Sequence, residues 1–159
     1  IEIEHQKAKE AHSVLIDTGK RVEYRKSIIH ETKLQMSADL QYKQAESQLL
    51  LKEQYKDGLE ILESAAEIAP RNWTVQAAYA YALAKVNYPG NSEKVREGEK
   101  ILQKALNAAN SSDMVHFWAG NMNWAMHRNS SARSEFETAL RINPNNTDAR
   151  KALRAMSKG

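Results

Sequence analysis

Three turn-forming residues, Pro70, Asn110 and Pro144, divide this chain at intervals of 40 and 34 residues. Each is preceded by the same small and apolar residues at the same offsets. The three copies are Gly58, Leu62, Ala65, Pro70; Gly98, Leu102, Ala105, Asn110; and Ala132, Phe136, Ala139, Pro144. Proline cannot continue a helix, so a helical segment is expected to end at Pro70 and at Pro144. Because the same residues precede Asn110 at the same offsets, a helical segment is expected to end there as well. A pattern that recurs at this period predicts a short array of helical repeats.

The composition of the segments between these turns favours helices over strands. Only 6 Gly and 3 Pro occur among 159 residues, and Ala, Leu, Glu, Lys and Gln fill the periodic segments. These residues have high helix propensity, and no alternating run of β-branched residues indicates a strand. We therefore predict an all-α domain of about seven helices, which is enough to bury one elongated core.

The repeated pattern resembles the tetratricopeptide repeat (TPR), a unit of 34 residues folded as two antiparallel helices. The resemblance covers residues 39–159. It implies helix pairs at 39–72, 73–112 and 113–146 and a capping helix at 147–159. In that family a small residue in the first helix, such as Gly120 or Ala80, lets the second helix pack closely, and an apolar residue such as Phe136 fills the gap between units. The expected fold is a TPR helical-repeat solenoid with an N-terminal helical extension.

The chain departs from the family pattern at two places. Glu46 stands where the first unit is expected to have its small residue, and six extra residues lengthen the second unit. The extension falls around residues 87–91, where Tyr88, Pro89 and Gly90 favour a turn. We expect it to form a longer loop between two helices that leaves the repeat intact.

The resemblance also implies a binding surface, because the first helices of successive units line a concave groove in such arrays. The family's groove-facing positions correspond here to Lys43, Ser47, Ala77, Tyr81, Met114, Phe117, Asn121 and Trp124. Aromatic residues and methionine supply much of the binding energy at the centres of interfaces. We therefore expect the groove to hold a protein or peptide partner, with core packing as the alternative role for these rings. Trp118 and Trp73 lie on other faces and are expected to be packing residues.

Some TPR proteins hold the acidic C-terminal tails of heat-shock chaperones with a clamp of lysine, arginine and asparagine side chains, which form charge-assisted hydrogen bonds. Only Lys43 stands at such a position here. The other clamp positions are occupied by Ser47, Ala78, Met114 and Trp118. The sequence therefore disfavours carboxylate clamping.

The N-terminal segment does not fit the repeat, and residues 8–24 resemble the end of a J-domain, the helical module that stimulates heat-shock chaperone ATPases. The resemblance makes Asp17 a turn between two helices. It rests on Ala11, Val14, Leu15, Asp17, Arg21, Glu23 and Tyr24. The His-Pro-Asp tripeptide that carries J-domain activity is missing. We therefore interpret residues 1–26 as an inactive J-domain-like remnant, with a chance amphipathic helix and turn as the alternative.

A connecting helix is expected to follow this remnant within residues 1–38. No proline or glycine interrupts residues 22–55, and apolar residues recur there with roughly helical spacing. Ser37, followed by Ala38 and Asp39, indicates a break at which the first repeat helix starts, with a plain solvent-exposed serine as the alternative. Because the chain opens at Ile1 inside the resembling helix, we interpret it as a fragment of a longer protein.

Enzymatic, metal and membrane functions find no support in the sequence. The five histidines lack the spacing of a zinc site, there is no cysteine, and no phosphate-binding or nucleophile motif occurs. No apolar stretch reaches the roughly 18 residues of a membrane span, and no secretion leader is present. We predict no catalytic, cofactor-binding or metal-binding residues, no membrane insertion, and a cytoplasmic location.

Nucleic-acid binding is also disfavoured. The net charge is only +3, and the 20 acidic residues are interleaved with the basic ones. The predicted function is a non-enzymatic adaptor or scaffold that binds a protein partner in the groove, within a bacterial regulatory protein. Two alternatives stay open: the client-binding part of a J-domain co-chaperone, and a self-associating assembly element. The sequence does not determine the oligomeric state.

Overall fold

The computed structural model describes residues 2–159, with side chains from Asp17 onward. Its elements are α1 (Glu2–Leu50), α2 (Tyr55–Ile68), α3 (Trp73–Asn87), α4 (Ser92–Ala108), α5 (Asp113–Ala125), α6 (Asn129–Ile142) and α7 (Thr147–Lys158). Every element in this range is an α-helix, which confirms the predicted all-α fold class. Within the described residues, no helix is both long and apolar enough to cross a membrane.

The chain consists of two compact units. The first ends at Met36, and the second runs from Ser37 to Gly159. In the first unit, α1 is uninterrupted through Asp17, and the exposed Arg21 guanidinium lies 3.1 Å from the Asp17 carboxylate one helical turn earlier. The predicted turn at Asp17 is therefore wrong, because this pair supports a continuous helix.

The structure accordingly gives no support to the J-domain-like remnant of residues 1–26. Three of the residues on which that interpretation rests, Ala11, Val14 and Leu15, lie outside the described side chains. The predicted break near Ser37 is also wrong, since α1 continues to Leu50. Neither glycine nor proline occurs between Gly19 and Gly58, so no residue in this stretch forces the helix to end.

The turns at Pro70, Asn110 and Pro144 share one hydrogen-bond pattern. The residues that directly follow α2, α4 and α6 are Ala69, Ala109 and Asn143. Each donates its N–H to the carbonyl oxygen four positions earlier. A polar residue follows three positions after each of these, at Asn72, Ser112 and Asn146. Its N–H donates to the carbonyl oxygen of the residue three positions earlier, and its side chain caps the next helix. Such caps contribute about 1 kcal/mol each. The turn forms with either proline or asparagine at the punctuating position.

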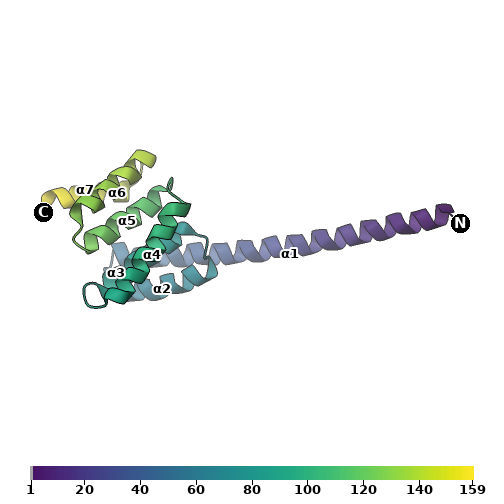
Figure 1. Cartoon of the computed structure of the whole chain (residues 1–159), viewed down its shortest axis with the longest axis horizontal. Coiled ribbons are helices and arrows are strands. Elements are labelled where there is room, and N and C mark those ends of the chain that lie inside the picture. The colour runs from purple at the N-terminus through teal and green to yellow at the C-terminus, as the bar shows by residue number, and fades with distance from the viewer. Residues whose placement is uncertain (1) are drawn as a thin grey trace. The chain divides into compact units, whose positions relative to one another are not determined.

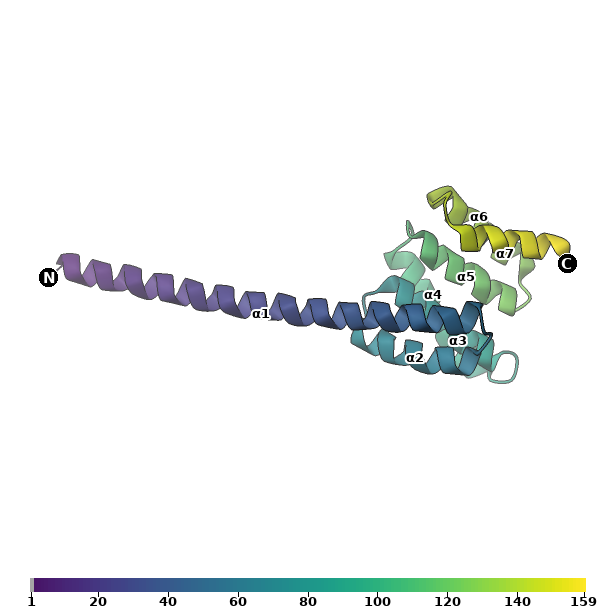
Figure 2. The same cartoon turned by 180° about the vertical axis from the view of Figure 1, so that it is seen from behind.

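The helices of the second unit pack in succession. α2 packs on α3, α3 on both α4 and α5, α5 on α6, and α6 on α7. Figure 1 shows this order, and Figure 2 shows the same helices from behind. The close approach expected between paired helices is present at Gly120, where an added Cβ would lie 2.5 Å from the Phe136 ring. At Gly98 it would lie 2.9 Å from the Ala80 carbonyl oxygen.

The six extra residues of the second repeat lengthen its helices more than its loop. α3 has 15 residues and α4 has 17, compared with 13 in α5 and 14 in α6. The loops are similar in length: residues 88–91 join α3 to α4, and residues 126–128 join α5 to α6. The expectation of a longer loop is therefore largely wrong. Helix-forming residues on either side of Pro89 and Gly90 extend the helices up to a short turn.

The first repeat is offset by one residue from the family register. Ala45 is fully buried, and an added Cβ on Gly58 would lie 3.7 Å from its carbonyl oxygen, as Gly98 approaches Ala80 in the next repeat. Ala45 is thus the small residue of this repeat, and the assignment of that place to the half-buried Glu46 is wrong. A turn at residues 51–54 joins α1 to α2, one residue longer than the turn after α5, and this accounts for the offset.

Candidate functional site

Aromatic rings form a chain of contacts across the first helices of the repeats. The Trp118 ring of α5 stacks on Tyr81 of α3 with centroids 5.4 Å apart, and meets Tyr42 of α1 edge-on at 6.3 Å. On the other side, Phe136 lies 6.0 Å from Phe117 and 6.3 Å from Trp124. Each such pair contributes about 0.5–1.5 kcal/mol beyond its buried area. The rings therefore tie α1, α3, α5 and α6 together.

The buried Trp118 indole has a hydrogen-bond partner in Tyr42. Its N–H donates to the Tyr42 hydroxyl oxygen at 3.0 Å, and that hydroxyl donates to a Glu46 carboxylate oxygen at 3.3 Å. Burial, followed by the charge of Glu46, raises the pKa of Tyr42, so the hydroxyl keeps its proton at neutral pH. Burial also raises the pKa of Glu46, and the nearby Asp148 of α7 acts in the same direction.

A pocket of about 470 Å³, which we call the end pocket, opens where the first helices end. Three rings from three helices line it, namely Tyr55 of α2, Tyr81 of α3 and Trp124 of α5. The other lining residues are Leu49, Leu50, Glu53, Lys85, Asn121, Ala125 and His127. The wall therefore combines aromatic and aliphatic groups with four polar or charged side chains.

Two turn residues at the end pocket have a strained backbone. Glu53 has φ 54° and His127 has φ 60°, and in the described part of the chain no other non-glycine residue has a positive φ. This left-handed conformation costs about 1–2 kcal/mol for a residue with a Cβ. Strained residues concentrate at functional sites. Their presence at a single pocket makes the end pocket the candidate site.

Lys85 places a positive charge in the wall of the end pocket. It is half-buried, whereas the other lining residues that can carry charge, Glu53 and His127, are exposed. The Lys85 ammonium lies 5.0 Å from the Tyr55 ring centroid, within cation–π range, and none of the ion pairs between described side chains includes Lys85. Burial raises the pKa values of Tyr55 and Tyr81. The inner wall therefore presents neutral rings and one cation.

Two solved structures share this arrangement of helices. The first TPR of Spaghetti (RPAP3), bound to an HSP90 peptide of sequence SRMEEVD, covers 77% of this chain and 92% of its own, with 17% identity and a TM-score of 0.51. The first TPR domain of the human RPAP3 protein covers 78% of this chain and 92% of its own, with 18% identity and a TM-score of 0.52. The fold is that of a TPR domain. No family model matches the sequence, and no curated protein is significantly similar to it.

The TPR structure brings three of the eight predicted groove residues together, because Tyr81, Asn121 and Trp124 all line the end pocket. The rings of Tyr81, Phe117 and Trp124 do not form an exposed cluster, and core packing, the alternative role expected for them, is found for two of the three. Phe117 and Tyr81 are only 2% and 6% exposed and pack in the core, whereas Trp124 is half-buried. Ala77 is also fully buried.

The remaining predicted groove residues, Lys43, Ser47 and Met114, do not line the end pocket. On α1, the hydrogen-bond network reaches Tyr42 and Glu46 instead, one residue before Lys43 and Ser47. Both residues therefore show the same one-residue offset along α1 as Ala45. Lys43 itself is exposed, and Ser47 and Met114 are half-buried.

Sequence reasoning missed several lining residues that helical periodicity could have found. Lys85 and Ala125 follow the predicted Tyr81 and Asn121 by four positions, so they lie one turn further along the same helix faces. Leu50 follows Glu46 by four positions, and Glu46 takes the place that was expected for Ser47 on α1. Tyr55, at the start of α2, and the turn residues Glu53 and His127 carried no comparable signal.

The clamp positions of the TPR fold are largely taken up by packing. Ala78 and Trp118 are fully buried, and the Met114 sulfur accepts a hydrogen bond from the Asn146 side chain at 3.6 Å. Their side chains cannot supply cationic donors to a ligand carboxylate. This is the physical reason why carboxylate clamping is not expected here.

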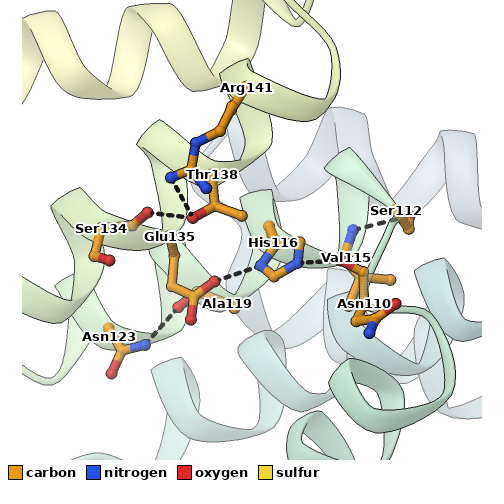
Figure 3. A network of polar contacts seen from close by, with 10 residues as sticks. All are labelled: Asn110, Ser112, Val115, His116, Ala119, Asn123, Ser134, Glu135, Thr138 and Arg141. Carbon is orange, nitrogen blue, oxygen red and sulfur yellow. Dashed lines mark hydrogen bonds and ion pairs between the residues drawn. The ribbon is translucent and has the colours of Figure 1, made fainter.

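A second polar cluster joins α5 to α6 (Figure 3). Nδ1 of His116 lies 2.6 Å from a Glu135 carboxylate oxygen, and Nε2 lies 2.8 Å from the Asn110 carbonyl oxygen. Both partners are hydrogen-bond acceptors, so a ring nitrogen that carries hydrogen has an acceptor on either side. No group of three or more metal-ligating side chains exists among the described residues. The cluster therefore has the geometry of a structural joint between the helix pair and the preceding turn.

Proposed function

We propose that this chain is a non-enzymatic adaptor module that binds a partner peptide or helix along the first helices of its repeats, with the end pocket as the anchor. The end pocket is the observation that carries the proposal. Rings from three helices and two strained turn residues converge on it. The similar TPR of Spaghetti binds an HSP90 peptide, which supports the use of this fold for peptide recognition.

The buried aromatic network supports the same role. The half-buried Trp124 is held against Phe136, so its pocket-facing surface is ordered before a partner arrives. Preordered aromatic anchors lose little entropy on binding, and a central anchor contributes about 2 kcal/mol or more. The proposal includes the setting predicted from the sequence, a cytoplasmic bacterial regulatory protein.

The test must alter the pocket without disrupting the core. Truncation of Tyr81 or Phe117 to alanine is unsuitable, because loss of a buried aromatic side chain costs about 3–5 kcal/mol. Lys85→Glu and Asn121→Arg instead change half-buried residues of the pocket wall. Lys104→Glu and Asn107→Arg make the same changes at exposed positions on α4 and serve as matched controls.

Partners captured by the wild-type protein from cell extract are quantified against both variant pairs, and circular dichroism confirms that each variant is folded. We expect at least one partner to fall about tenfold with the pocket variants, the loss of about 1.4 kcal/mol, and to remain unchanged with the α4 controls. Equal recovery of every partner by folded pocket variants contradicts the proposed function.

A further inference from the structure

Residues 17–36 of α1 carry exposed apolar side chains with basic neighbours. We propose that this segment is a docking surface for an acidic amphipathic helix of another protein, which packs along it as a coiled coil. Val22, Ile29 and Met36 form the apolar contact, which we call the α1 seam, and Lys26 and Lys33 pair with carboxylates of the partner. The segment lies in the first unit and shares no residue with the end pocket, so it is an additional binding surface.

The α1 seam has the spacing of a coiled coil. Val22, Ile29 and Met36 are seven residues apart, and the sequence continues this spacing back to Leu15 and Ala8. An apolar residue at every seventh position, position a of the heptad abcdefg, stays on one face of a helix that winds around a partner. The three residues of the seam are 46%, 55% and 67% exposed. Their apolar surface is therefore available for burial against a second helix.

The charged residues are segregated around the α1 seam. The basic residues at positions d, e and g, which border the seam, are Arg21, Arg25, Lys26 and Lys33. The acidic residues of the same segment all stand at positions b and c, on the outer side of the helix, and are Asp17, Glu23 and Glu31. Among the described side chains, Arg21 is the one seam-bordering cation with an ion-pair partner, Asp17. The border of the seam is therefore positive, and carboxylates at the e and g positions of a partner helix complement it.

A second copy of this chain does not fit the surface. In a parallel coiled coil, position g of one helix faces position e of the other, which would bring Arg21 of one copy against Lys26 of the second. In an antiparallel pair, e faces e, and Lys26 would oppose Lys33. Like charges that face each other across an interface disfavour such a pairing. The charge pattern therefore favours a partner of different sequence over self-association.

The α1 seam is also narrower than the apolar face of a membrane-surface helix. Such helices present a broad face that is rich in Trp, Phe and Leu. Here Ile28, at position g, is the one apolar residue of the segment that borders the seam, and Thr18 and Thr32 occupy the d positions. Tyr24, the single aromatic residue of the segment, lies at position c on the outer side. A narrow seam with polar d positions suits one partner helix that supplies larger apolar side chains.

Two designed peptides test the surface on the full chain. Each has four heptads with isoleucine at position a and leucine at position d, and carries either glutamate or lysine at every e and g position. The like charges keep each peptide from pairing with itself. Fluorescence anisotropy of the labelled peptides measures their affinities. We expect the glutamate peptide to bind at least about tenfold more tightly than the lysine peptide, because several ion pairs replace repulsive contacts. High salt should reduce the difference.

Matched variants assign the binding to the α1 seam. Ile29→Ala should weaken the glutamate peptide about tenfold or more through the lost apolar contact, whereas Leu34→Ala, at an outer position, should not. Alanine favours the helix at both positions, and circular dichroism checks that α1 is retained. Lys26→Glu should narrow the preference between the peptides, and Lys20→Glu, which makes the same change of charge on the outer side, should leave most of it intact.

Two further arms distinguish the other occupants. Vesicles of phosphatidylglycerol and phosphatidylcholine are assayed for co-sedimentation with the protein, and light scattering over a concentration series measures its mass. We expect no retention on the vesicles and no growth in mass that depends on Ile29. Vesicle binding or self-association that Ile29→Ala abolishes would assign the seam to a membrane or to a second copy and overturn the proposal. Equal affinities for the two peptides, or equal effects of seam and outer variants, would overturn it as well.

Discussion

Gly120 provides a sharp test of how the repeats pack. A methyl group added there would lie 2.5, 2.6 and 2.9 Å from three atoms of the Phe136 ring. Comfortable carbon contacts are about 3.5–4.0 Å, so the ring would have to move by roughly 1 Å. Phe136 is fully buried, and Phe117 and Trp124 flank it. These neighbours restrict the movement of the ring.

The expected stability of Gly120→Ala combines two opposing effects. Overpacking of a close-packed core costs about 1–3 kcal/mol, and alanine gains about 1 kcal/mol over glycine in a helix interior. With three atoms below 3.0 Å, we expect the upper part of the overpacking range and a net loss of about 1–2 kcal/mol. The midpoint of thermal unfolding should fall by about 4 °C per kcal/mol for a unit of this size.

A double-mutant cycle with Phe136→Leu isolates the contact. The leucine variant alone should cost about 1–2 kcal/mol because it fills less space. In the double variant the smaller side chain accommodates the new methyl group, so the loss should be about 1–2 kcal/mol less than the sum of the single losses. Urea unfolding followed by tryptophan fluorescence measures all four proteins. Gly19→Ala, whose added methyl meets nothing within 4 Å, is the control and should leave unfolding of the second unit unchanged.

Additivity within about 0.5 kcal/mol would refute this reasoning, because it would mean that the two side chains do not compete for the same space. A stabilised Gly120→Ala single variant would refute it as well. In that case the helix propensity of alanine would outweigh the predicted clash.

The remaining predictions concern the aromatic network and the pocket turns. Tyr42→Phe should lower the free energy of unfolding by about 1–3 kcal/mol, because the buried Trp118 N–H loses its acceptor; urea titration measures this, and the exposed Tyr24→Phe should have no effect. Burial raises the pKa of Glu46 in the folded state, so the carboxylate disfavours folding above that pKa, and stability falls as pH rises through it. Glu46→Gln should therefore be more stable than wild type at pH 7, with the difference vanishing as pH falls below the ordinary value of 4.5; unfolding curves across that range check the sign. His127→Gly should raise stability by about 0.5–1 kcal/mol by relieving the positive φ, and a lowered thermal midpoint would contradict it.

The helical repeats could be predicted from the sequence because their signals are local. The turns at Ala69, Ala109 and Asn143 use backbone hydrogen bonds and a cap three residues later, and both lie within a few positions of Pro70, Asn110 and Pro144. The small residue Gly120 and its partner Phe136 stand at offsets set by the helix pair itself. These features repeat because the two helices of every unit pack against each other and against the neighbouring units in the same way.

The candidate site was harder to predict, because it depends on lengths and contacts between distant segments. One additional turn residue before α2 offsets the face of α1, so that Tyr42 and Glu46 take the places expected for Lys43 and Ser47. Burial of Phe117 and Tyr81 depends on partners from other helices. The N-terminal residues show the same limit, since a pattern suggesting a turn at Asp17 is continuous helix.

The sequence by itself thus determined the all-α repeat, its turns and the approximate faces of its helices, because helix propensity, capping and periodicity act over a few residues. Only the tertiary structure decided which rings are buried and where a pocket remains. The end pocket requires Tyr55, Tyr81 and Trp124 from three helices and the strained turns at Glu53 and His127. Those positions follow from the register of packed helices, which short-range signals do not specify.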